Sequence, residues 1–199
     1  NTSFMNSHMI KNSEWGAVAY LTHSIYGRNR NEITRNSSNL CYTGGGSGTA
    51  YIANSAQSTT GNIYGIYDMS GGTQDRVAAY NSVDKYNNFT LWNGLTSETP
   101  SSRYATRYYN ETGSGSGSII YDVGKTGDAT KETYMGVDRY SWYNGYAESA
   151  FAGRPFFMRG GTYDASVGVF SSSSTEGGGY SAIGFRAVLC VRISIEAIK

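Results

Sequence analysis

Near the start of the chain, apolar residues recur at helical spacing. Trp15, Val18 and Ala19, followed by the methyl group of Thr22, lie at the i, i+3, i+4, i+7 positions of a helix with one buried face. This spacing predicts a short helix over residues 14–21. Its exposed first amides would be capped by the side chain of Ser13 or of Asn12.

Near the end of the chain the spacing changes to a period of two. Apolar residues occupy every second position from Phe185 to Ile195, and mostly polar residues stand between them up to Glu196. This alternation predicts a long, half-buried terminal strand whose apolar set faces the core. The middle of the chain offers many short β-like pieces.

Low-complexity tracts separate these pieces. The glycine-rich stretches at residues 44–48 and 113–118 and the four serines at 171–174 predict flexible loops. The tract at 113–118 is alternatively a linker between two domains, but neither half would then have a clean core of its own. We therefore expect one domain over residues 1–199, with an insertion at about residues 81–150.

Composition adds a preference for neutral polar chemistry. The 199 residues include 26 Gly and 18 Tyr, only 16% are charged, and the formal net charge is +1. Such a chain has no broad field for binding nucleic acid or an anionic membrane. Tyr with Ser, Gly and Asn is typical of antibody combining sites. The plainer interpretation is a turn-rich β-protein of extracellular type.

Motifs of common catalysis and metal binding fail when their spacing is checked. The tripeptide at 124–126 (GKT) follows an apolar run, but a phosphate-binding loop needs glycine where Ile119 stands. His8, His23, Cys41 and Cys190 lack zinc-ligand spacing. Two ordinary histidines and two buried or bridged cysteines are expected instead, and the spacing leaves a Cys41–Cys190 bridge open. Neither end carries a long apolar run, which is typical of a soluble fragment or a processed form.

Three blocks, in the right order, resemble the formylglycine-generating-enzyme (sulfatase-modifying factor) family. They are residues 12–20 (NSEWGAVAY), residues 61–71 (GNIYGIYDMSG), and residues 158–163 (MRGGTY) with 184–188 (GFRAV). The resemblance implies an α+β architecture, the C-type lectin fold in its formylglycine-generating-enzyme-like variant. Taken by themselves, glycines in these blocks suit tight turns and close backbone approaches. Arg159 and Arg186 suit buried or half-buried guanidinium groups that hold loops, and Asp68 a turn or helix cap.

The sequence departs from this family where the family's chemistry lies. The enzymes carry a reactive cysteine pair just after the RGG block, and this chain has TYDA at residues 162–165. Without two thiols the oxidase chemistry fails, so we expect no enzyme activity of that type. A family calcium site loses its Asn at Gly72 and two Trp nearby, although Asp68 and Asp75 keep carboxylates. We therefore expect no cofactor, with calcium the only candidate.

A second group with this fold fits the departures better. The chain is similar to the variable proteins of diversity-generating retroelements, which display a mutated C-terminal segment as a ligand-binding face. The corresponding segment here is residues 162–183. We expect its small, polar and tyrosine side chains to bind ligand at the surface: Tyr163, Asp164, Ser166, Ser171, Ser172, Ser173, Ser174, Thr175, Glu176, Tyr180 and Ser181. Tyr143 and Tyr146 would add an aromatic wall, whereas a core role is expected for Trp142.

The resulting prediction is a non-catalytic binding module for a protein or carbohydrate ligand on a cell or host surface. It would be extracellular, cell-surface or virion-displayed, would bind no nucleic acid, and would not insert into a membrane through this fragment. Two other classes stay open: a formylglycine-generating-type oxidoreductase, and a pilin-like or tail-like structural subunit. The plainer alternative for residues 171–179 is a solvated loop without a binding role.

Overall fold

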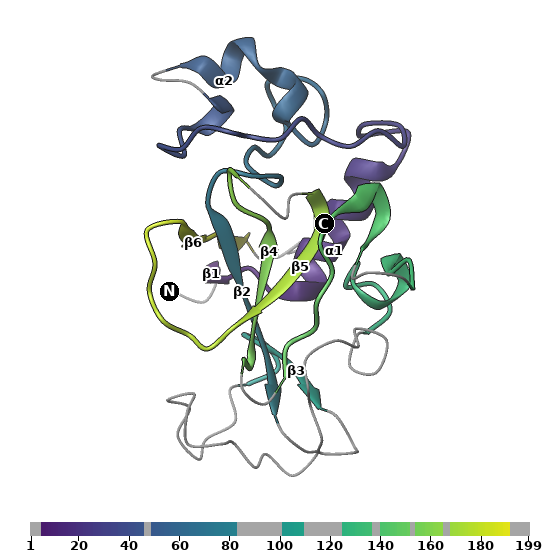
Figure 1. Cartoon of the computed structure of the whole chain (residues 1–199), viewed down its shortest axis with the longest axis vertical. Coiled ribbons are helices and arrows are strands. Elements are labelled where there is room, and N and C mark those ends of the chain that lie inside the picture. The colour runs from purple at the N-terminus through teal and green to yellow at the C-terminus, as the bar shows by residue number, and fades with distance from the viewer. Residues whose placement is uncertain are drawn as a thin grey trace, which may run out of the picture.

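The computed structural model describes residues 5–45, 49–82, 101–109, 125–136, 140–151, 154–164 and 168–191. They form a mixed α+β fold with a curled sheet and few helices (Figure 1). The strands are β1 (Met5–Met9), β2 (Gln74–Ser82), β3 (Thr106–Tyr109), β4 (Phe156–Gly160), β5 (Gly168–Thr175), β6 (Ile183–Phe185) and β7 (Ala187–Val191). The helices are α1 (Asn12–His23) and α2 (Ala50–Ala53), with 3-10 turns η1 (Thr43–Gly45), η2 (Ser55–Gln57), η3 (Lys131–Thr133) and η4 (Trp142–Asn144).

Strand β2 is the centre of the larger sheet. β4 pairs with one edge of β2 in antiparallel direction, and β5 continues the sheet antiparallel to β4. On the other edge, β6 runs parallel to the start of β2 and β3 runs parallel to its end. β1 and β7 form a separate antiparallel ribbon. Ile10, the residue after β1, links this ribbon to the larger sheet: its carbonyl accepts a hydrogen bond from the amide of Ala78 at 2.7 Å. Ala78 lies on β2 between the residues that pair with β6 and those that pair with β3.

Helix α1 confirms the helix predicted near the start of the chain. It begins two residues earlier and ends two residues later than predicted. Trp15, Ala19 and Thr22 are buried, as the spacing requires. The predicted cap is wrong: the cap position is Lys11, whose amide donates to the Glu14 carboxylate at 2.8 Å. Asn12 is instead a buried residue of the first turn, with its side chain committed to partners in the core.

Over residues 185–191, the predicted terminal strand is two strands with its apolar face reversed, and the rest of the prediction, residues 192–196, lies outside the described residues. β6 pairs with β2 and β7 with β1, with a break at Arg186. Phe185 and Leu189 are 69% and 61% exposed, while Val188 packs against the core. The reversal has a physical reason: Arg186 turns inward to form an ion pair with Asp75. Because neighbouring side chains of a strand point to opposite faces, this sets the residues on either side outward.

The four serines at 171–174 belong to strand β5, so the predicted loop at this position is wrong. β5 pairs with β4 from Phe156 opposite Thr175 to Arg159 opposite Ser172. The hydroxyl groups have partners as well: Ser172 donates to the carbonyl of Glu148 at 3.1 Å and Ser174 to its carboxylate at 2.9 Å. A serine-rich run is stable inside the sheet because its buried polar atoms are paired.

The sheet has a core face and an outer face. Val77, Ala79 and Phe157 belong to the hydrophobic core with Trp15 of α1. Because side chains alternate along a strand, Ala78 and its neighbours at positions 76, 156 and 158 point to the opposite face. Figure 1 shows α2 with its flanking segments at one end of this sheet.

The predicted insertion and one glycine-rich tract fall in parts of the chain that the structure describes incompletely. Within the predicted insertion at residues 81–150, β3, η3 and η4 are described, whereas the tract at 113–118 lies outside the described residues. Among the helices of the described part, none is long and apolar enough to cross a membrane.

Candidate functional site

The sequence blocks at 12–20, 158–163 and 184–188 meet around the indole ring of Trp15. The guanidinium carbons of Arg159 and Arg186 lie 5.7 and 5.8 Å from its ring centre. The indole nitrogen donates to the carbonyl of Val169 at 2.8 Å. Gly160 has a φ of +83°, and a β-carbon there would lie 3.2 Å from Cη2 of Trp15. Glycine is therefore the residue that this close, left-handed position requires.

Arg159 holds this centre together through four hydrogen bonds. Its Nε donates to the carbonyl of Ser171 at 2.8 Å, and Nη2 donates to the carbonyl of Ala129 at 2.9 Å. Its Nη1 donates to Asn12 Oδ1 at 2.8 Å and to the carbonyl of Asp128 at 2.9 Å. Burial lowers the pKa of Arg159 to about 10, so the side chain stays charged at neutral pH. The predicted structural role of Arg159 is confirmed.

Arg186 is the half-buried counterpart. Its Nε donates to Asp75 Oδ2 at 2.5 Å and its Nη2 to the carbonyl of Asp68 at 2.7 Å. Burial raises the pKa of Asp75, while the charge of Arg186 opposes that rise. The Asp68 carboxylate accepts from Asn36 Nδ2 at 2.7 Å and from Thr43 Oγ1 at 2.9 Å. The two carboxylates that the sequence offers for calcium are thus engaged by protein donors.

Other candidate ligands for a metal do not gather either. Within the described ranges, no group of three or more His, Cys, Asp or Glu side chains is placed to hold a metal ion. Cys41 and Cys190 are both free thiols, and neither is buried, so the expectation that they are buried or bridged is wrong. His8 and His23 each contact another side chain instead: His8 binds Glu14, and His23 binds the hydroxyl of Tyr143.

The predicted exposure of the β5 side chains is also wrong. Ser171 and Ser172 are fully buried, Ser173 is 9% exposed, and Ser174 and Thr175 are 5% and 6% exposed. Ser173 accepts a hydrogen bond from Gln74, which lies on β2. The first three serines are therefore buried in the fold and are not exposed for ligand binding.

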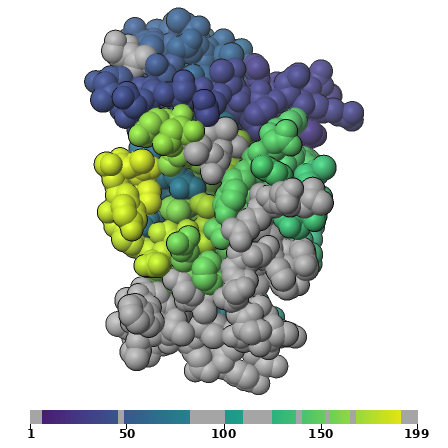
Figure 2. Space-filling view, in the orientation of Figure 1, coloured from purple at the N-terminus to yellow at the C-terminus, as the bar shows by residue number. Residues whose placement is uncertain are grey.

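The end of β5 nevertheless borders an open pocket of about 280 Å³ on the outer face of the sheet. Four of the side chains predicted for binding line it: Ser174, Thr175, Glu176 and Tyr180. The lining also includes three residues that were not predicted: Arg154, Met158 and Ile183. Figure 2 shows this face hollowed beside the yellow segment that follows β5. The lining combines hydroxyl groups, a carboxylate and a guanidinium group, which suit hydrogen bonding to a polar ligand.

The loop between β5 and β6, residues 176–182, forms one wall of the pocket, and its backbone is held by hydrogen bonds from β2. Arg76 on β2 donates from Nη1 to the carbonyl of Gly177 at 2.8 Å and from Nη2 to that of Gly178. The Tyr180 ring lies beside Gly178, where an added β-carbon would sit 3.5 Å from it. This arrangement fixes the backbone of the loop and leaves Tyr180 67% exposed.

The other predicted binding residues lie elsewhere or outside the described chain. Tyr163 is half-buried, and its amide donates to the carbonyl of Gly72 at 2.9 Å. Asp164 is exposed and accepts from the hydroxyl of Thr162 at 2.6 Å. Ser181 is exposed but does not line the pocket, and Ser166 lies outside the described residues.

The aromatic residues near 142–146 do not border the pocket. Trp142 and Tyr143 pack against the core, where both contact Phe170 and His23. The core role predicted for Trp142 is confirmed. Tyr146 is half-buried and, like Tyr143, is absent from the pocket lining, so the structure places neither of them in a wall of this pocket.

The pocket residues missed by sequence reasoning differ in how visible they are. Met158 stands beside Arg159, and strict alternation along a strand sets it opposite to the buried arginine. Arg154 carries no such signal, because it precedes β4 and pairs only through an isolated bridge to Phe151. Its place in the pocket depends on tertiary structure alone.

Comparison with known proteins adds no family to this picture. A scan of the chain against protein-family models finds none that matches, and a search of the curated proteins finds no matching protein.

Proposed function

We propose that this chain is a non-catalytic ligand-binding protein whose C-terminal segment presents a binding pocket on a rigid frame. The observation that carries the proposal is the pocket of about 280 Å³ at the end of β5. Four residues of one short segment, 174–180, converge there from a strand end and a loop. The side chains of this segment therefore form most of one concave, polar surface, which is typical of a recognition site.

The frame beneath the pocket supports the C-type lectin fold in its formylglycine-generating-enzyme-like variant. The blocks that carry this resemblance are distant in sequence, yet their members Trp15, Arg159 and Arg186 are in contact. Gly71 and Gly160 join them, since the amide of Gly71 donates to the carbonyl of Gly160 at 2.9 Å. Such mutual contacts are expected when blocks of this kind define a common core.

The separation between frame and pocket supports the variable-protein interpretation. Arg159 and the first β5 serines are buried and hydrogen-bonded, so most substitutions there would cost stability. Glu176 and Tyr180 are exposed on a loop whose backbone carbonyls at Gly177 and Gly178 accept hydrogen bonds from Arg76. Their side chains can change without disturbing those contacts. We infer display on a cell or virion surface, where a changeable pocket would meet protein or carbohydrate targets.

The pocket chemistry favours a ligand rich in hydroxyl or amide groups. Arg154 supplies donors, Glu176 supplies acceptors, and Tyr180 offers an aromatic face with a hydroxyl group. Met158 and Ile183 add a small apolar floor on which a sugar ring or an aliphatic side chain can rest. No step of bond making or breaking is assigned to these residues.

The test is a binding screen of the purified chain against an immobilised glycan array and a displayed peptide library. Wild type is compared with Tyr180→Ala and with Tyr64→Ala, a matched control because Tyr64 is an 89% exposed tyrosine outside the pocket. We expect a probe that binds wild type and Tyr64→Ala, with affinity about tenfold or more weaker for Tyr180→Ala. The proposal is contradicted if no probe on the glycan array or in the peptide library binds, or if Tyr180→Ala leaves the binding unchanged.

A further inference from the structure

The polar groups that line the pocket at the end of β5 differ in whether the chain already uses them. Ser174 donates its hydroxyl hydrogen to the Glu148 carboxylate at 2.9 Å, and Thr175 Oγ1 accepts from the amide of Gly177 at 3.3 Å. These hydroxyl groups hold the end of β5 and the start of the following loop in place. A ligand therefore finds its polar partners mainly among the other lining residues.

Three polar side chains of the lining are uncommitted: Arg154, Glu176 and Tyr180. All three are exposed, and none of them forms a side-chain hydrogen bond or an ion pair within the described part of the chain. The guanidinium group of Arg154 and the carboxylate of Glu176 thus border the same pocket without pairing with each other. Each is accessible to a ligand group of the opposite charge.

The backbone that carries these side chains is fixed by hydrogen bonds. Arg154 and Phe151 exchange two backbone hydrogen bonds, at 2.9 and 3.1 Å. Arg76 binds two backbone carbonyls of the loop after Glu176. A site whose backbone is ordered before binding loses less conformational entropy when a ligand arrives.

We propose that this pocket takes a zwitterionic group with a short hydrocarbon stem, whose carboxylate pairs with Arg154 and whose ammonium pairs with Glu176. The guanidinium fork suits a carboxylate, and the Tyr180 ring offers the ammonium an aromatic face. Met158 and Ile183 are the apolar part of the lining and contact the stem. This inference rests on the proposed function, because it names the ligand class of the same pocket. The target is then a protein on which a lysine side chain lies beside a carboxylate, and not a neutral glycan.

The experiment is an NMR titration of the full chain with 6-aminohexanoate, followed on the amide signals of residues 176–183. Hexanoate lacks the ammonium, hexylamine lacks the carboxylate, and 6-hydroxyhexanamide carries no charge. We expect wild type to bind 6-aminohexanoate about threefold or more tightly than either singly charged probe, because each exposed ion pair contributes about this much. This preference should shrink at high ionic strength, because salt screens both ion pairs.

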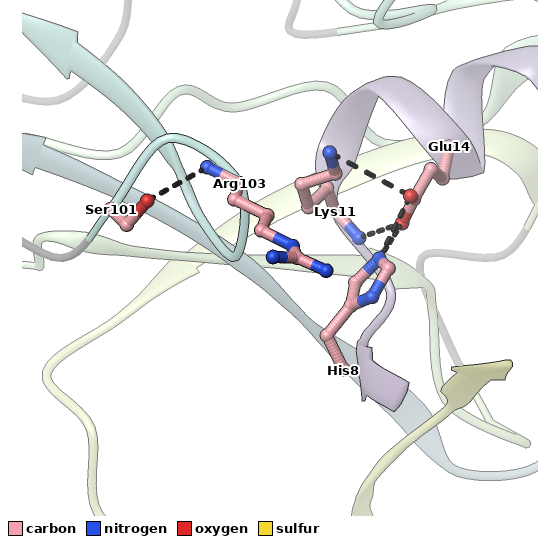
Figure 3. Close-up of polar contacts among 5 residues, drawn as sticks. All are labelled: His8, Lys11, Glu14, Ser101 and Arg103. Atoms are coloured by element: carbon pink, nitrogen blue, oxygen red, sulfur yellow. Dashed lines mark hydrogen bonds and ion pairs between the residues drawn. The ribbon is translucent and has the colours of Figure 1, made fainter. Parts of the chain in front are cut away.

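Two variants separate the two ion pairs. Arg154→Gln should reduce the preference over hexylamine to about onefold and keep the preference over hexanoate, and Glu176→Gln should do the reverse. Arg103→Gln and Asp164→Asn are the matched controls, because they make the same changes of net charge at exposed residues outside the pocket lining. Figure 3 shows the Arg103 side chain extending toward His8 on β1. Both controls should keep both preferences.

The proposal is overturned if wild type binds the zwitterion no more tightly than the singly charged probes, if none of the four probes binds, or if both preferences persist in both variants. Equal losses in the control variants would overturn it as well. The neutral probe separates this failure from failure of the proposed function. If it binds as tightly as the zwitterion and Tyr180→Ala weakens both, only the zwitterion inference fails. If Tyr180→Ala leaves the binding of every probe unchanged, the proposed function fails too.

Discussion

Replacement of Arg159 by methionine tests the frame on which the pocket rests. Methionine keeps the unbranched stem but removes four hydrogen bonds, and it leaves the carbonyls of Ser171, Ala129 and Asp128 without these donors. A hydrogen bond to a charged group contributes about 1.5–3 kcal/mol. Their sum overstates the loss, because Arg159→Met also removes the cost of burying a charge. Breaking such a buried network costs about 3–5 kcal/mol.

The assay is urea denaturation followed by circular dichroism, with thermal melting as a second measure. Arg159→Met should lower the free energy of unfolding by about 3–5 kcal/mol and Tm by about 6–20 °C for a chain of this length. Arg186→Met is the matched comparison, since Arg186 also lies over Trp15 but is half-buried and makes two hydrogen bonds. A loss below about 1 kcal/mol for Arg159→Met, or one no larger than that of Arg186→Met, would refute the reasoning.

Three further changes have defined outcomes. Burial raises the pKa of Glu32 from 4.5 to about 7, so the fold favours the neutral form, and stability present below pH 4.5 is lost as pH rises through 7. In urea denaturation at pH 4.5 and 8, Glu32→Gln should remove this loss of at most about 3 kcal/mol; an unchanged pH dependence contradicts it. Gly160→Ala should cost about 1–3 kcal/mol in the same assay, and Gly179→Ala, which meets nothing within 4 Å, under about 0.5 kcal/mol. Arg76→Met should speed amide hydrogen exchange at residues 177–182 about tenfold; unchanged exchange would mean that Arg76 does not anchor the loop.

Local patterns predicted those parts of the fold that short-range physics decides. The helical spacing around Trp15 was sufficient for α1, because one buried face with polar surroundings specifies a helix within a few turns. The structural role of Arg159 followed from an arginine beside paired glycines. In each case the residues that decide the structure are neighbours in sequence.

Other parts depended on partners far along the chain. Serines 171–174 form a strand because β4 pairs with their backbone and Glu148 and Gln74 bind their hydroxyl groups. The face of β7 was reversed by the ion pair of Arg186 with Asp75, 111 residues away. Period-two patterns state that side chains alternate, but only a tertiary contact decides which set points inward.

The pocket was predictable in the same partial way. Glu176 and Tyr180 belong to a polar loop between two strands, and such loops commonly carry binding residues. Arg154 enters from a segment that sequence reasoning assigned to no site.

Sequencing of natural copies of this gene tests the central claim most directly. If residues 162–183 display an exchangeable pocket on a fixed frame, substitutions should concentrate at exposed positions such as Glu176, Tyr180 and Ser181. Arg159 and the buried residues Ser171 and Ser172 should stay constant in the same copies. Substitutions spread evenly along the chain, or concentrated at the buried serines, would contradict the account.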